Sequence, residues 1–134
     1  MYRSSNGELM GVVRVKSGVL FTVIAPGGFH MLSALDSISG YLDIDLTITS
    51  ACDGEHSGPD DPHYKGEAYD VRTSDLLNKK EVIRELQNEL GDLYFYVFLE
   101  CPDTDNEHIH MQVKKGVVYP PNNSQQVQEA VIDT

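Results

Sequence analysis

The sequence predicts an α+β fold, with an antiparallel sheet of about four strands and two helices packed on one face. Short segments with alternating apolar residues recur along the chain and indicate strands. Two longer segments, residues 29–42 and 78–90, carry apolar residues at helical spacing. The chain has 134 residues, enough for one hydrophobic core, so we expect a single domain over residues 1–134.

The first 26 residues predict a β-hairpin. Three valines within residues 12–15 precede a Lys-Ser-Gly turn at 16–18, and the apolar run 19–24 follows. The Pro-Gly-Gly sequence at 26–28 is expected to end this run. We therefore expect residues 1–26 to form a hairpin extension of the main domain.

The segment 29–42 predicts the first helix because apolar residues recur there every three or four positions: Leu32, Leu35, Ile38 and Leu42. A short strand with alternating apolar residues is expected over 45–49. A loop over 53–62, rich in Asp, Gly and Pro, then leads to His63.

The second helix has the clearest boundaries. Asn78, with Glu81 three positions later, is typical of a capped helix N-terminus, and Gly91 is typical of a C-cap. Between them one face is apolar, formed by Ile83, Leu86 and Leu90.

Three further strands are expected, over residues 67–73, 93–99 and 108–114. In the last one, alternate side chains share a face, which groups His108, His110 and Gln112. The remaining segment, 116–134, is the tail of the domain, and from residue 120 onward it is polar and expected to be loosely ordered.

Two short motifs contain the residues that could bind a metal ion or catalyse a reaction. The first is His63-x-x-Gly-x-Ala-x-Asp70, and the second is Glu107-x-x-His110. Together they supply two imidazoles, a carboxylate ligand and a spare carboxylate, which is the inventory of a catalytic zinc site. Gly66 lets the backbone bend, so that the His63 ring can converge with Asp70.

These motifs resemble those of the zinc D-Ala-D-Ala metallopeptidases, which include D,D-carboxypeptidases, D,D-dipeptidases and phage L-alanyl-D-glutamate endopeptidases. The core fold of that family is similar to the signalling domain of hedgehog proteins. The resemblance covers about residues 27–115. It implies that His63, Asp70 and His110 bind Zn²⁺ in a cleft on the sheet, and that Glu107 is the catalytic base. It also implies a function, the hydrolysis of peptidoglycan stem peptides.

The chain departs from the family pattern at three places. Asp61 stands where the family usually has Ser, and Ile109 where Trp is common. Asp53 stands near the place of an Arg that meets the substrate in the family. An acid there repels a terminal carboxylate, which favours an endopeptidase over a D,D-carboxypeptidase. Arg72 shares the strand face of Asp70. It either replaces the missing Arg as the substrate anchor or is a solvated residue at the end of the strand.

Asp53 and His108 are the candidate substrate-binding residues. His108 either lines the cleft, where it can stabilise an oxyanion, or replaces His63 as a metal ligand. We expect His56 to be a solvated loop residue, with a substrate contact as the alternative. The alternative to an enzyme is a catalytically inactive zinc-binding interaction module of hedgehog-like fold. The presence of Glu107 beside the expected ligands favours the enzyme.

Composition limits the partners. The net charge of −11 argues against nucleic acid, because a binding surface for phosphates needs a basic patch. No run approaches the ~20 apolar residues that span a membrane, so we expect no membrane insertion. We expect a monomer whose partner is a peptidoglycan stem peptide.

The N-terminus has no apolar core typical of a secretory signal. We therefore expect the protein to be made in the cytoplasm and then released to the cell wall, as phage lysis enzymes are released by holins. The alternative is that a signal has been removed from the sequence. Cys52 and Cys101 lie near the ends of two predicted strands. They either pair, if those strands are neighbours, or stay reduced and buried.

Overall fold

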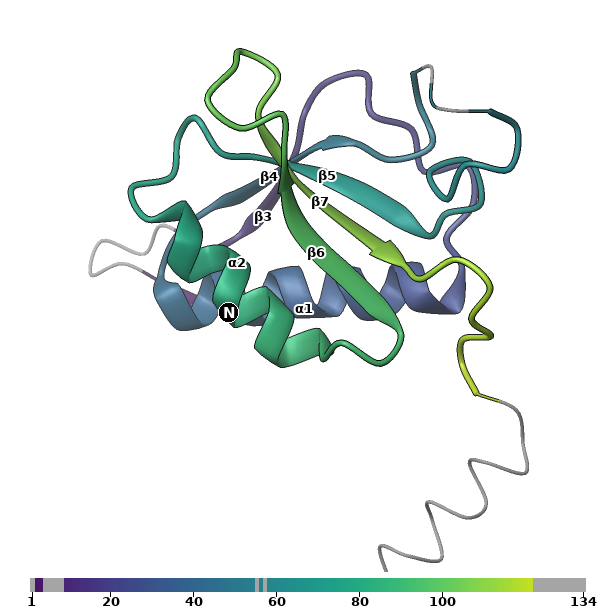
Figure 1. Ribbon diagram of the computed structural model, residues 1–134. Helices are drawn as coiled ribbons and strands as arrows, with labels where there is room; N and C mark the ends of the chain where they lie inside the picture. The colour runs from purple at the N-terminus through teal and green to yellow at the C-terminus, as the bar shows by residue number, and fades with distance from the viewer. Residues whose placement is uncertain (1, 4–8, 55, 57, 122–134) are drawn as a thin grey trace, which may run out of the picture.

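The computed structural model describes residues 2–3, 9–54, 56 and 58–121 (Figure 1). Its elements in chain order are β1 (Tyr2–Arg3), β2 (Leu9–Met10), β3 (Val13–Val15), α1 (Pro26–Leu42), β4 (Leu46–Ser50), β5 (Ala68–Arg72), α2 (Lys79–Leu90), β6 (Phe95–Glu100) and β7 (His108–Val113). Of the predicted tail over 116–134, residues 122–134 lie outside the described part of the chain. Within its described part, the Tyr119 ring packs against Phe95 with centroids 5.0 Å apart, whereas Val118 is exposed.

The main sheet has five strands in the order β3-β4-β5-β7-β6. Both helices cover the same face of this sheet, so the predicted α+β class with two helices on one face is confirmed (Figure 1). The prediction of an antiparallel sheet of about four strands is wrong in one respect. β3 adds a fifth strand and runs parallel to β4, which makes the sheet mixed. Neither helix in the described ranges is long and apolar enough to cross a membrane.

The predicted hairpin is not formed. Residues 13–15 pair with β4, with Val13 opposite Leu46, and residues 19–25 contain no strand. In addition, Arg14 Nε lies 2.7 Å from Asp45 Oδ2 at the start of β4. Alternating valines predict a strand but not its partner, and here the partner is 33 residues away in sequence. A separate antiparallel pair, β1 with β2, lies at the N-terminus.

Helix α1 begins at Pro26, three residues earlier than predicted. Proline suits a first helical turn, because its missing N–H would have no partner there. At Gly28 a Cβ would overlap the Gly66 carbonyl oxygen, so the helix start can approach the loop before β5 only because this residue is glycine. Helix α2 has the predicted ends. Asn78 Oδ1 accepts from the Glu81 N–H at 3.1 Å, and the Gly91 N–H donates to Gln87 O.

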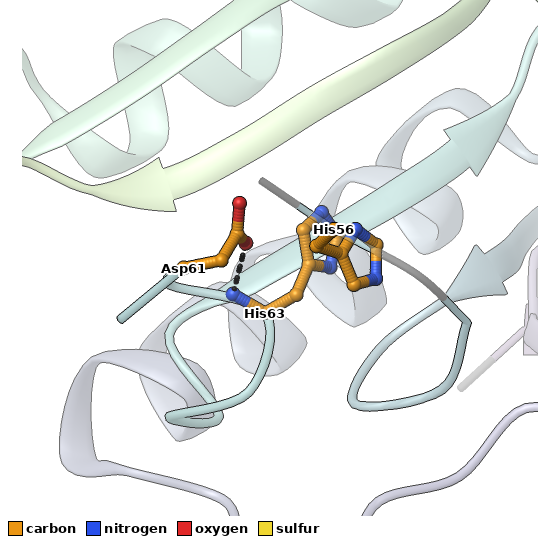
Figure 2. A group of neighbouring side chains, drawn as sticks. All are labelled: His56, Asp61 and His63. Carbon is orange, nitrogen blue, oxygen red and sulfur yellow. Dashed lines mark hydrogen bonds between the residues drawn. The ribbon is translucent and has the colours of Figure 1, made fainter. Parts of the chain in front are cut away.

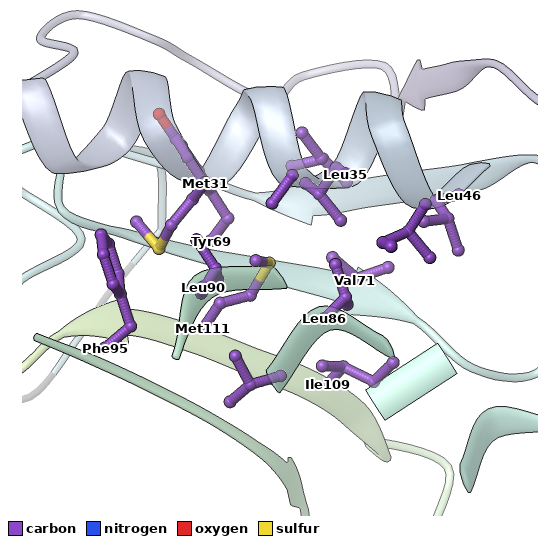
Figure 3. Packing of buried hydrophobic residues seen from close by; sticks show 14 of the residues in the cluster. Met31, Leu35, Leu46, Tyr69, Val71, Leu86, Leu90, Phe95, Ile109 and Met111 are labelled. Carbon is purple, nitrogen blue, oxygen red and sulfur yellow. The ribbon is translucent and has the colours of Figure 1, made fainter. Parts of the chain in front are cut away.

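The hydrophobic core fills the space between the helices and the sheet (Figure 3). Odd-numbered residues of β5 and β7 face this core and are fully buried: Tyr69, Val71, Ile109 and Met111. Because side chains alternate along a strand, the even-numbered residues of β5 and β7 face the opposite, helix-free side. We call that side the open face, and it carries the candidate site.

Candidate metal centre

Strand register brings four polar residues together on the open face. Asp70 of β5 lies opposite His110 of β7, and Glu100 of β6 lies opposite His108 of β7. Directly opposite residues in adjacent strands share a face. The prediction that His108 and His110 lie on one face is confirmed.

His63 reaches the same place from the loop before β5. Its backbone N–H donates to Asp61 Oδ1 at 2.9 Å, and Gly66 turns the chain with φ of 70°. A Cβ at Gly66 would overlap the Val23 carbonyl, so the turn requires glycine. The His63 ring is 3% exposed, and its Nε2 lies 3.2 Å from Asp70 Oδ1. The predicted convergence of His63 with Asp70 is therefore present.

Three imidazoles point at one carboxylate oxygen. Around Asp70 Oδ1 lie His110 Nδ1 at 3.0 Å, His63 Nε2 at 3.2 Å and His108 Nε2 at 3.5 Å. The second nitrogen of each ring also faces an oxygen, at 2.7 to 2.9 Å: Ala51 O for His63, Asn106 O for His108 and Gln112 Oε1 for His110.

This arrangement has more acceptors than protons. A neutral imidazole has one N–H and can satisfy only one of two acceptors. With these amide and ring orientations, a neutral ring leaves one of its two contacts without a proton, and a second proton or a cation beside Asp70 would satisfy it. A divalent metal ion meets this need with neutral rings, and the donor set of two imidazoles and a carboxylate suits Zn²⁺. The oxygens behind the rings would then hold the ligands in orientation.

The electrostatics agree with a cation at this place. Burial alone would raise the pKa of Asp70, but hydrogen bonds from His110 and His63 outweigh it and hold the pKa well below the usual range. Burial alone would lower the pKa of His110, yet the bonds to Asp70 and Gln112 raise it above its usual value. Positive charge is thus favoured next to the Asp70 carboxylate. His63, Asp70 and His110 offer ligand atoms within 4.8 Å of one another and could hold a metal ion.

Two residues of this neighbourhood were not predicted. The His56 ring stacks on His63 with centroids 3.9 Å apart and planes 5° apart, so it is not a freely solvated residue (Figure 2). With Asp61 and His63 it forms a second group that could hold a metal ion. Glu100 forms a third such group with His108 and His110. Only the pairing of β6 with β7 shows its place, since no sequence motif marks it.

Glu107, the predicted catalytic base, is bound by residues outside the cluster of histidines, and its catalytic role stays a prediction. Its carboxylate contacts Thr73 Oγ1 at 2.7 Å, Lys79 Nζ at 2.8 Å and the Asp103 N–H at 2.8 Å. Lys79 begins α2, so the Glu107 carboxylate is engaged by groups other than Asp70 and the three histidines, although Glu107 and His108 line the same groove. The physical reason is alternation: Glu107 has the parity of buried Ile109 and not of the open-face histidines.

Glu107 should instead give a pH-dependent contribution to stability. The Asp103 N–H, Lys79 and Thr73 lower its pKa from 4.5 to about 2. Because the folded-state pKa is depressed, this stabilisation is complete above pH 4.5 and is lost as the pH falls through about 2. We expect Glu107→Gln to lower the Tm near neutral pH, and the difference from wild type to shrink in acid. Thermal unfolding followed by circular dichroism across this range measures it; a difference independent of pH would contradict the assignment.

Asp53 is hydrogen-bonded to neighbouring backbone groups, and its predicted substrate contact stays a prediction. Its Oδ1 accepts from the Ala51 N–H at 2.9 Å and the Leu20 N–H at 3.1 Å. Burial raises the pKa of Asp53, but these bonds outweigh it and lower the pKa overall. The carboxylate therefore braces the loop whose Ala51 carbonyl holds His63.

Both cysteines are free thiols. Cys52 is partly buried, whereas Cys101 is exposed, so the expectation of two buried cysteines is wrong for Cys101. Among the residues that the structure describes, neither thiol belongs to a group that could hold a metal ion. The candidate centre therefore rests on histidines and carboxylates.

The chain was compared with known proteins, and no family model, curated protein or solved structure matches it.

Proposed function

We propose that this chain is a zinc-dependent peptidase of the D-Ala-D-Ala metallopeptidase type, with a hedgehog-like fold, acting on peptidoglycan stem peptides. His63, Asp70 and His110 would hold the ion. The observation that carries the proposal is the convergence of three imidazoles on Asp70 Oδ1, at 3.0 to 3.5 Å, without enough protons to satisfy all their acceptors. Bound Zn²⁺ would supply Lewis acidity and a water of lowered pKa.

Glu100 and His108 are the groups that can move protons beside this centre. Glu100 Oε1 lies 2.8 Å from His108 Nε2, and the Glu100 side chain is 44% exposed. The Asn106 carbonyl accepts from His108 Nδ1 at 2.7 Å, which fixes the ring and leaves Nε2 to share a proton with Glu100. In this mechanism the pair takes a proton from the attacking water and returns it to the leaving amine, the role that the resemblance implies for Glu107.

The open face also offers contact area for a peptide. Phe98 and Tyr96 on β6 are 40% and 46% exposed. The Phe98 ring lies 5.1 Å from the His110 ring, centroid to centroid, so this apolar surface begins at the metal centre. Exposed aromatic side chains beside a site provide binding area at low entropic cost.

One observation favours the second candidate, a zinc-binding interaction module without hydrolysis. Glu107, the base expected from the resemblance, is held by Lys79. In such a module, Glu100 and His108 would only support the metal ligands.

Metal content and turnover, measured on the same protein, separate the candidates. We expect one Zn²⁺ per chain by elemental analysis after loading and dialysis. We also expect mass spectrometry to show new amines released from soluble stem peptides. Zinc without turnover on any peptidoglycan fragment would favour the interaction module. Well under a tenth of an equivalent of zinc would contradict the metal centre itself.

A further inference from the structure

A groove with an apolar floor lies at one end of the helix layer. Its volume is about 510 Å³. The end of α1, the start of β4 and the segment that leads into α2 form it, where the two helices lie side by side (Figure 1). None of its residues belongs to a group of residues that could hold a metal ion, so the groove is separate from the candidate centre. Its apolar side chains are Leu42, Ile44, Leu76, Leu77 and Val82.

The Leu77 side chain is held in solvent at the edge of this groove. Its relative exposure is 107%, whereas the neighbouring Leu76 packs against the hydrophobic core. The chain is fixed on both sides of Leu77: the Leu76 N–H donates to Thr73 O at 3.0 Å, and Asn78 Oδ1 accepts from the Glu81 N–H at 3.1 Å. An exposed apolar side chain, fixed next to an apolar groove, is typical of a binding surface.

The rim of the groove is acidic. It includes Asp43, Asp45, Asp75 and Glu81, and no basic residue of the described chain lines it. Four of the eleven lining residues are thus acidic, against 21 of the 134 residues of the whole sequence. Negative charge is therefore concentrated around the apolar floor, beyond the general acidity of the protein.

Two of these carboxylates lack a counter-charge. Asp43 and Asp75 are exposed, and within the described ranges neither forms an ion pair. Asp43 directly follows α1, where the negative end of the helix dipole disfavours a carboxylate and favours a cation. By contrast, Asp45 is matched by Arg14 at 2.7 Å. A cation that docks at the groove can therefore interact with two carboxylates that the fold leaves without a partner.

We propose that this groove docks a positively charged, amphipathic segment of a partner protein. Apolar side chains of that segment occupy the floor and cover Leu77, and its lysine or arginine side chains meet Asp43 and Asp75. A volume of about 510 Å³ suits a short segment with a few apolar side chains. This role goes beyond the proposed peptidase function and does not depend on it.

Charge also argues against occupants from the protein itself. Residues 122–134 include two acids and no lysine or arginine, so they do not complement the acidic rim. A second copy carries the same net charge of −11, which opposes association of the two copies. A basic partner is attracted by the same field, and added salt should weaken its binding.

The test uses a short, fluorescently labelled peptide of leucine and lysine and the full-length protein. Two matched peptides replace lysine with glutamate or leucine with serine. We expect fluorescence anisotropy at low salt to show binding of the leucine–lysine peptide, with affinities at least about tenfold weaker for the other two.

One pair of variants locates the charge effect. Asp43→Asn combined with Asp75→Asn should weaken binding of the leucine–lysine peptide by about fivefold, the range for two exposed ion pairs. The matched control is Asp60→Asn combined with Asp92→Asn, two exposed acids outside the groove. It changes the net charge equally and should leave the affinity nearly unchanged.

A second pair locates the apolar contact. Leu77→Ser should weaken binding of the same peptide by about tenfold, because it removes the exposed apolar contact at the edge of the groove. Leu93→Ser, at a position that is 68% exposed and outside the groove, is the matched control and should have no effect. Both leucines are exposed, so neither substitution removes a core contact.

The outcomes are decisive for the docking site. No binding of the leucine–lysine peptide, equal weakening by the two pairs of Asp substitutions, or full affinity in Leu77→Ser would overturn it. Sedimentation equilibrium of the wild-type protein tests the other occupant: a dimer that Leu77→Ser dissociates would assign the groove to a second copy and reject the basic partner. None of these measurements involves zinc or hydrolysis, so the docking site and the peptidase function are tested separately.

Discussion

Asp70→Asn is expected to abolish stoichiometric zinc binding. Asp70 Oδ1 is the atom on which His63, His108 and His110 converge, so the substitution removes the single anionic ligand from the proposed set. Loss of residues that merely orient ligands costs about 10- to 100-fold in metal affinity, and loss of a ligand should exceed this. Elemental analysis after dialysis and competition with a chelator measure the change.

The matched control is Asp61→Asn. Asp61 belongs to the alternative group with His56 and His63, and it accepts the His63 backbone N–H. We expect this variant to retain zinc, because Asp61 contributes no ligand to the proposed centre. If Asp61→Asn lost the metal and Asp70→Asn kept it, the ion would belong to the His56 group.

In the wild-type protein, the affinity for zinc should fall as the pH is lowered, because protons compete for the imidazoles.

Glu100→Gln is expected to keep zinc and lose hydrolysis by about 10²-fold or more, the range for a positioned acid–base group. The substitution preserves the shape of the side chain but removes the proton acceptor that lies 2.8 Å from His108 Nε2. Rates of stem-peptide cleavage at saturating substrate, with zinc content measured in parallel, isolate this effect from metal loss.

Glu107→Gln provides the comparison between the two carboxylates. Its side chain is bound to Lys79 and Thr73, so this variant should lose stability but retain most of its activity at a temperature where it is folded. The opposite pattern, an active Glu100→Gln and an inactive Glu107→Gln, would restore the role that the sequence motif assigns to Glu107.

Local interactions explain which parts of this fold could be predicted. The ends of α2 depend on Asn78, Glu81 and Gly91, which lie within a few residues of the groups they bind. The shared face of His108 and His110 follows from the alternation of any strand. These features require no knowledge of a distant partner.

The errors arose where a residue's role depends on a partner far along the chain. The valine pattern at Val13–Val15 predicts one strand of a hairpin, but the strand pairs with β4. The motif predicts Glu107 as a neighbour of His110, but its carboxylate is bound by Lys79, 28 residues away in sequence. Glu100 carries no motif and reaches His108 only through the register of β6 with β7.

The sequence by itself determined the α+β class, the capped helix and the candidate ligands His63, Asp70 and His110, which could hold a metal ion, because patterns of spacing and residue chemistry are local. Only the tertiary structure decided that β3 runs parallel to β4, that His56 stacks on His63, and that Glu100 rather than Glu107 lies beside the histidines. The reason is that strand pairing and side-chain ion pairs depend on global packing, which brings together residues that local propensity treats as independent.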